Sequence, residues 1–100
     1  MNEYLILAED TPNSLELRRT ARPAHLARLK ELQQQNRLVL AGPYFHQDTT
    51  NPAEGGVKGS MLVLKFDSIT TAKEWAAADP YVTAGVYQNI SVNTFKTTLP

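Results

Sequence analysis

The clustering of apolar residues along the chain predicts four β-strands. Leu5–Ala8 and Met61–Leu64 are apolar at every position, which is typical of strands that have both faces covered. Pro43 donates no backbone hydrogen bond, and it therefore places the second strand at an edge or an end of the sheet. The predicted strands span Leu5–Ala8, Arg37–Phe45, Ser60–Phe66 and Gln88–Phe95.

Leucines at helical spacing predict a long helical segment between the first two strands. Asn13 and Glu16 have the spacing of a capping box, which indicates where the segment starts. Pro23 interrupts it, so we expect either a kink or a short first helix and a second one that begins near Thr20. The segment continues to about Asn36 and contains Leu15, Leu26, Leu29 and Leu32.

A second helical segment lies between the third and fourth strands. Ser68 or Thr70 is expected to cap a helix over 71–78, and Asp79 with Pro80 stops or restarts it. A short helical turn over 81–85 then ends at a glycine. The order β-α-β-β-α-β predicts one α+β domain over 1–100, a ferredoxin-like sandwich with a four-stranded antiparallel sheet.

The two faces of this sheet have different expected neighbours. Both helical segments of a ferredoxin-like fold lie on one face, yet the strands at 5–8 and 61–64 are apolar on both. A second copy of the same sheet is the simplest cover for the other face. We therefore expect a homodimer that closes into an α/β barrel.

Composition excludes several classes of function. Ten Lys and Arg balance ten Asp and Glu, which argues against nucleic-acid binding through phosphate neutralisation. The chain has no Cys, so it has no thiolate chemistry, and this fits a reducing compartment. No apolar run approaches the roughly 20 residues of a membrane span, and the start lacks the basic region of an export signal. We expect a cytoplasmic protein.

The most informative polar residues are Arg22 and His25. At about 100° per residue, both project within roughly 40° of the apolar stripe of the predicted first helical segment. Burial of a charge or an imidazole without a partner costs several kcal/mol. These side chains therefore need partners from the fold, from a second subunit or from a ligand. The structural alternative is a core histidine bonded to a backbone carbonyl.

Other residues could build a site around this pair. An Asp before Pro commonly caps the following turn, but Asp79 could instead accept from His25 Nδ1–H and orient it as a general base. An Arg22 fork could hold a carboxylate or phenolate oxygen of a small anion. Ser60 and Tyr81 could add hydroxyl donors near a cleft, although both are also common in such places without a function.

Other signals are weaker. Six of the ten basic residues lie from Arg18 to Arg37, and Arg28 and Lys30 among them are interpreted as part of a solvated helix face. His46 and Asp48 could ligate a metal, but two such residues in a loop-rich region are weak evidence. The glycines lack the spacing of a phosphate-binding loop. We expect neither a metal nor another cofactor.

Several segments together resemble the YciI-like, or YCII-related, family over nearly the whole chain. The most specific is the run from Asp79 to Tyr87. The others are Arg22–Leu29, Ala41–Pro43 and Gly59–Ser60.

The resemblance implies a ferredoxin-like α+β fold that dimerises into an α/β barrel. It also implies a candidate active site built on a histidine and an aspartate, which fall on His25 and Asp79. A chlorohydroxyhydroquinone dehydrochlorinase belongs to the family, and muconolactone isomerase has a similar fold. Such an analogy carries over the fold better than the substrate.

Three classes of function follow. The first is a cofactor-independent lyase or isomerase in which His25 is the base, Asp79 orients it, and Arg22 with Ser60 holds the developing oxyanion of a small cyclic substrate. The second is a non-catalytic protein that binds a small molecule in the same cleft. The third is an interaction protein that uses its sheet face and the loop 49–59. A histidine paired with an aspartate in a cleft favours the first two.

Overall fold

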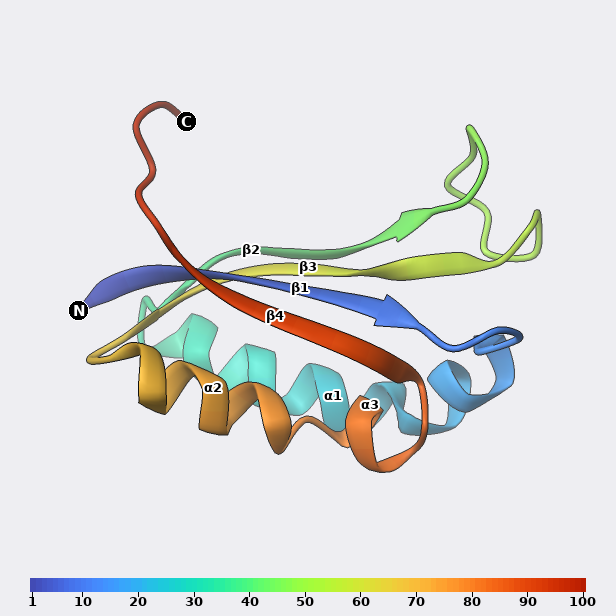
Figure 1. The fold of residues 1–100 in the computed structure, drawn as a ribbon, viewed down its shortest axis with the longest axis horizontal. Helices are drawn as coiled ribbons and strands as arrows, with labels where there is room; N and C mark the ends of the chain where they lie inside the picture. The colour runs from blue at the N-terminus through green and yellow to red at the C-terminus, as the bar shows by residue number, and fades with distance from the viewer.

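Four antiparallel strands form one sheet in the order β2-β3-β1-β4, and the helices lie against one face of it (Figure 1). The structure, a computed structural model, describes all 100 residues. Its elements are β1 (Asn2–Asp10), α1 (Leu15–Gln34), β2 (Leu38–Phe45), β3 (Val57–Phe66), α2 (Ile69–Ala77), α3 (Pro80–Thr83) and β4 (Tyr87–Phe95). The predicted α+β ferredoxin-like fold is confirmed. Pro43 lies in β2, which is an edge strand as expected.

Alternation along the strands builds the core. Tyr4, Ile6 and Ala8 of β1 are buried on the face that the helices cover, whereas Leu7 between them is 41% exposed. Leu64 and its neighbours of the same parity on β3 extend this buried face. The main core cluster consists of Tyr4, Ile6, Leu29, Leu32, Leu62, Leu64, Phe66, Ala72 and Ala76.

The helix α1 is continuous from residue 15 to residue 34, with Pro23 inside it. The capping-box prediction is wrong, because Ser14 is the N-cap and Asn13 adopts a positive φ of 59°. The Ser14 hydroxyl donates to the buried carboxylate of Asp10 instead of capping the helix. Pro23 removes one backbone donor. Packing of the leucines that follow it against the sheet keeps the helix intact, and a second helix does not begin near Thr20.

The second helical segment forms two helices with separate caps. Ser68 caps α2 and accepts a hydrogen bond from the backbone N–H of Thr71 at 3.1 Å. Asp79 caps α3, where its Oδ1 accepts from the backbone N–H of Tyr81 at 2.9 Å. Gly85 follows α3 with a φ of +80°, a conformation that glycine adopts without strain. The local capping role predicted for Asp79 is therefore present.

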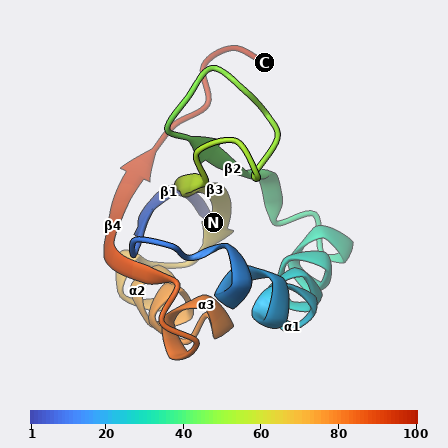
Figure 2. The same cartoon turned by 90° about the vertical axis from the view of Figure 1, so that its right-hand side faces the viewer.

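The other face of the sheet carries no helix, as the end-on view shows (Figure 2). Leu7 and Leu40 on this face are 41% and 46% exposed. They line a shallow groove of about 720 Å³ together with Met61 and the segment Ala41–Tyr44. We call the helix-free face of the sheet, which carries this groove, the outer face. None of the helices is long and apolar enough to cross a bilayer.

Gly59 marks a close approach between three strands, and we expect Gly59→Ala to destabilise the fold. An added methyl group would overlap the carbonyl oxygen of Ala8 and lie 2.5 Å from the hydroxyl of Tyr44. Overpacking of this kind costs about 1–3 kcal/mol. Urea denaturation measures the loss. Gly42→Ala is the control, because a methyl group there meets nothing within 4 Å. Equal effects of the two substitutions would contradict the prediction.

Candidate active site

His25 of α1 and Asp79 of α3's N-cap form a buried pair. The Nδ1 atom of His25 lies 2.9 Å from Oδ1 and 3.0 Å from Oδ2 of Asp79. His25 is 6% exposed and Asp79 is 2% exposed. Because an ionised carboxylate can only accept, we assign the ring hydrogen to Nδ1, which leaves Nε2 as the basic nitrogen. Two residues 54 positions apart are thus brought together.

The Tyr81 ring packs against the flat face of the His25 imidazole. The rings of His25 and Tyr81 stack with their centroids 3.9 Å apart and their planes 12° apart. Tyr81 is also the second residue of α3, where its backbone N–H donates to the same Asp79 carboxylate that contacts the His25 ring. Burial raises the pKa of the Tyr81 phenol, so its hydroxyl stays protonated near neutral pH. The stack and the cap together fix the orientation of His25.

A buried ion pair lies beside the His25–Asp79 pair. Arg18 of α1 donates to both carboxylate oxygens of Asp10, from Nε at 2.6 Å and from Nη2 at 2.9 Å. Ser14 donates to the same carboxylate at 2.5 Å. The Nη2 atom of Arg18 also donates to the hydroxyl oxygen of Ser60 at 2.7 Å. Burial alone would lower the pKa of Arg18, but its bonds to Asp10 outweigh this effect and raise it.

This second pair also touches the aromatic side chains of the site. The guanidinium of Arg18 lies 4.9 Å from the centre of the Tyr81 ring, and Tyr81 meets Tyr87 edge to face. The hydroxyl of Tyr87 is buried without a hydrogen-bond partner. Burial raises the pKa of this phenol. The polar wall of the site therefore joins α1, α3 and three strands.

A cavity of about 180 Å³ opens between α1 and the β2–β3 edge of the sheet. His25, Arg18 and Ser60 contribute its polar lining. Arg22 also lines it, but its side chain is exposed, so the prediction that Arg22 is buried on the apolar face is wrong. At the position of Arg22, this face of α1 borders the open cavity and not the core. The remaining lining residues are Leu26, Leu29, Ala41, Gly42, Pro43, Leu62 and Tyr81.

The structure therefore brings all five candidate residues to one place. Besides the His25–Asp79 pair, Arg22, Ser60 and Tyr81 all line the cavity. Asp79 stands behind His25 and does not line it. The lining segment Ala41–Pro43 is shared with the groove on the outer face, so one stretch of β2 separates the cavity from that groove.

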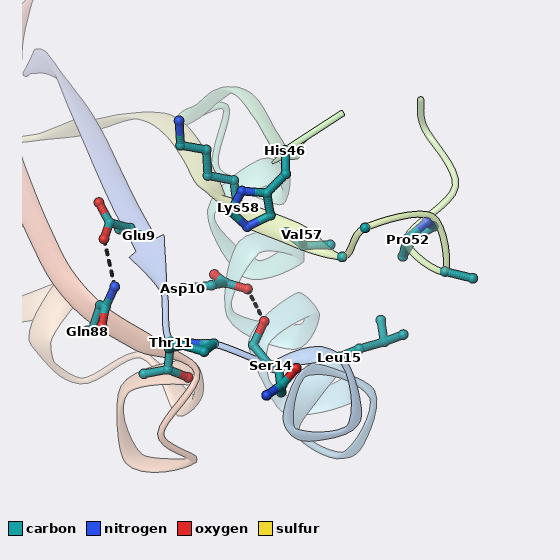
Figure 3. Close-up of a pocket in the computed structure, with 15 residues that line it drawn as sticks. Glu9, Asp10, Thr11, Ser14, Leu15, His46, Pro52, Val57, Lys58 and Gln88 are labelled. Carbon is teal, nitrogen blue, oxygen red and sulfur yellow. Dashed lines mark hydrogen bonds between the residues drawn. The ribbon is translucent and has the colours of Figure 1, made fainter. Parts of the chain in front are cut away.

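A larger and more open cavity of about 680 Å³ lies on the other side of Asp10 (Figure 3). Figure 3 shows Asp10 and Ser14 joined by their hydrogen bond, with His46 above Asp10. His46 is exposed, and Asp48 does not line this cavity. The structure contains no group of three or more histidine, cysteine or acidic side chains that could hold a metal ion.

Asp10 and Arg18 are the parts of the site that sequence reasoning missed. Asp10 has the same parity as Tyr4, Ile6 and Ala8, so an extension of the strand by two residues would have placed it on the buried face. Arg18 lies four residues before Arg22 and seven before His25, which puts it on the same helix face. These two signals were available in the sequence.

Comparisons with known proteins identify the family. Residues 2–96 match the model of the YCII-related domain. The chain belongs to this family. It is 52% identical to an uncharacterised protein of Haemophilus influenzae over 93% of this chain and 95% of that one. It is 48% identical to the protein YciI of Escherichia coli, with the same coverage of both chains.

A solved structure of an enzyme has the same fold. The chain is similar to 5-chloro-2-hydroxyhydroquinone dehydrochlorinase (TftG) from Burkholderia phenoliruptrix AC1100 in complex with 2,5-dihydroxybenzoquinone. The TM-score is 0.81 at 28% sequence identity, and the match covers 94% of this chain and 93% of that one. The fold of this chain therefore also occurs in a dehydrochlorinase.

We expect Asp10→Ala to destabilise the protein strongly, because it leaves the Arg18 guanidinium buried without its charged partner. Breaking a buried ion pair from one side costs about 3–5 kcal/mol. Chemical denaturation monitored by circular dichroism measures the free energy of unfolding. Glu16→Ala is the matched control, since Glu16 pairs with Arg19 on the exposed side of α1 and should cost less than about 1 kcal/mol. A loss at Asp10 no larger than at Glu16 would show that the buried pair is not stabilising.

Proposed function

We propose that this chain is a cofactor-independent enzyme of the lyase or isomerase type that acts on a small, anionic, oxygenated ring compound. The observation that carries the proposal is the buried His25–Asp79 pair at a cavity of about 180 Å³. A cavity of about 150 Å³ holds one benzene ring. The available space therefore suits a single substituted ring.

In this proposal His25 is the general base. Its Nδ1–H donates to Asp79, so the Nε2 atom is free to accept a proton from carbon or oxygen of the substrate. The electron pair released by the substrate moves onto a ring oxygen or expels a leaving group. Asp79 does not reach the cavity, and its role is to orient His25 and to stabilise the imidazolium that forms.

Arg22 and Ser60 would hold the negative charge that develops on the substrate. Arg22 lines the cavity and has no acidic partner within ion-pair distance, so its guanidinium is available to an anionic oxygen. The Ser60 hydroxyl oxygen already accepts from Arg18, and its own hydrogen is therefore available to a ligand oxygen. Tyr81 would contribute a flat wall beside the bound ring. A cytoplasmic location fits this proposal and the absence of cysteine.

Titration with 2,5-dihydroxybenzoquinone tests the binding part of the proposal, because this compound occupies the similar enzyme TftG. We expect saturable binding by calorimetry, and weaker binding in Arg22→Met, which keeps an unbranched stem and removes the charge. Arg19→Met is the control, because Arg19 is exposed on the same helix and does not line the cavity. Equal binding by both variants would remove Arg22 from the site.

The catalytic part of the proposal is tested by measuring substrate turnover. Chloride release from 5-chloro-2-hydroxyhydroquinone is the first assay, and we expect His25→Asn to reduce it by about 10²–10⁴-fold, the usual contribution of a general base. His46→Asn is the control at the other histidine. Binding that survives His25→Asn, together with no chloride release by the unmodified protein, would favour the alternative of a non-catalytic binding protein.

The homodimer belongs to the same proposal. The outer face exposes Leu7, Leu40 and Phe95, and the helices lie on the other face of the sheet. Exposed apolar patches on small domains commonly mark protein interfaces. We propose that two copies pack through this face.

Light scattering tests the dimer, and we expect a mass of twice 11.1 kDa for the unmodified chain at micromolar concentration. Leu7→Glu should shift the protein to the monomer, because it buries a charge without a partner at the interface. Leu17→Glu is a matched control, since Leu17 on α1 is equally exposed at 41% but lies away from the outer face. A folded monomer of the unmodified chain would overturn the dimer.

A further inference from the structure

Arg28 lies one helical turn after His25 and joins α1 to the end of α2. Its Nη2 atom donates to the backbone carbonyl of Trp75 at 2.7 Å. Its guanidinium lies over the indole ring, 4.2 Å from the ring centre. The Trp75 carbonyl is in the last turn of α2, where a cation is favourable. These two contacts hold the guanidinium in a fixed position.

The other end of this guanidinium faces Asp79. The Nη1 atom of Arg28 is buried and makes no hydrogen bond. It lies 4.0 Å from Oδ2 of Asp79, the oxygen that is not used by the cap of α3. Burial lowers the pKa of Arg28 from its ordinary value, although Asp79 and Glu31 partly oppose this. A buried guanidinium nitrogen that has no hydrogen bond and lies near a carboxylate indicates a role beyond packing.

The buried carboxylate of Asp79 needs a nearby positive charge to balance it. Its hydrogen-bond partners are the His25 ring and the backbone N–H of Tyr81, and neither is a permanent cation. A carboxylate that is 2% exposed is costly unless a positive charge balances it.

Other charged and titratable groups around the pair do not supply this charge. Arg18 on α1 is already bound by both oxygens of Asp10 from β1. Arg22 is exposed at the cavity. The phenols of Tyr81 and Tyr87 face the site from α3 and β4, and burial keeps both neutral by raising the pKa of each. This leaves Arg28.

We propose that Arg28 is a positioning residue that balances the charge of Asp79 and thereby keeps His25 neutral. A carboxylate alone would draw a proton onto the imidazole and form a salt bridge with it, whereas a nearby cation opposes the second positive charge. His25 then retains an unprotonated Nε2 and can act as a base. This inference rests on the proposed function for its purpose, but the charge state itself does not depend on any substrate.

The experiment is ¹⁵N NMR of the His25 ring at about pH 7.5, one unit above the ordinary histidine value. In the unmodified protein we expect the neutral ring with hydrogen on Nδ1. Arg28→Met keeps an unbranched stem over Trp75 and removes the charge, and we expect the imidazolium fraction to rise at least about threefold. Arg28→Lys keeps the charge and should restore the neutral ring.

Two further variants make the result specific. Lys30→Met removes an exposed charge from the same helix and should leave the His25 spectrum unchanged. Arg28→Gln removes the charge but keeps a donor for the Trp75 carbonyl, so it provides a second test if Arg28→Met folds poorly. Circular dichroism checks the fold of each variant.

The inference is overturned if the unmodified ring is already imidazolium, or if a folded Arg28→Met or Arg28→Gln has the same imidazolium fraction as the unmodified protein. Neither result depends on ligand binding. A protein that fails to bind 2,5-dihydroxybenzoquinone but shows the expected ring charges would overturn the proposed function alone.

Discussion

Burial of the Asp79 carboxylate is the constraint on which the rest of the site depends. Its Oδ1 accepts both from the backbone N–H that starts α3 and from the His25 ring on α1. The start of a helix and the orientation of an imidazole are therefore set by one carboxylate. Tyr81 stacks on His25 because it is the second residue of that same helix. Asp79 is held in place because it caps the backbone of α3, and this fixes the geometry of the His25–Asp79 pair. A flexible loop could not hold the carboxylate in this way.

The sequence predicted the sheet well because alternation of side chains is a local property. The parity of Tyr4, Ile6 and Ala8 indicates their common face whatever lies elsewhere in the chain. Residue chemistry could suggest a bond between His25 and Asp79, but no local pattern shows that residues 54 positions apart meet, and only the family resemblance pointed to this pair. The exposure of Arg22 was mispredicted for a related reason. Periodicity shows which way a side chain points on a helix, but not whether core or open cavity lies there.

Two of the four arginines of α1 face buried carboxylates, so the expectation that Arg28 lies on a solvated helix face is wrong. Asp10 takes Arg18 in close bidentate contact, while Asp79 has Arg28 at a longer distance and an imidazole in contact. The first arrangement is a closed ion pair of the kind that specifies a structure. In the second, one carboxylate lies between a histidine ring and a guanidinium, which is the arrangement that the proposed general base would use. The apparent excess of basic residues in this helix is explained in part by these inward-facing arginines.

The segment Ala41–Pro43 lines the cavity beside His25 on one side and the groove of the outer face on the other. This strand has no side chain larger than proline at these positions, so the two surfaces are separated by little more than backbone. Association through the outer face would therefore alter the stiffness of the cavity wall. Thermodynamic linkage then requires the reverse effect, in which a ligand in the cavity changes the affinity between subunits by the same factor. In the proposed dimer, ligand affinity would then depend on protein concentration.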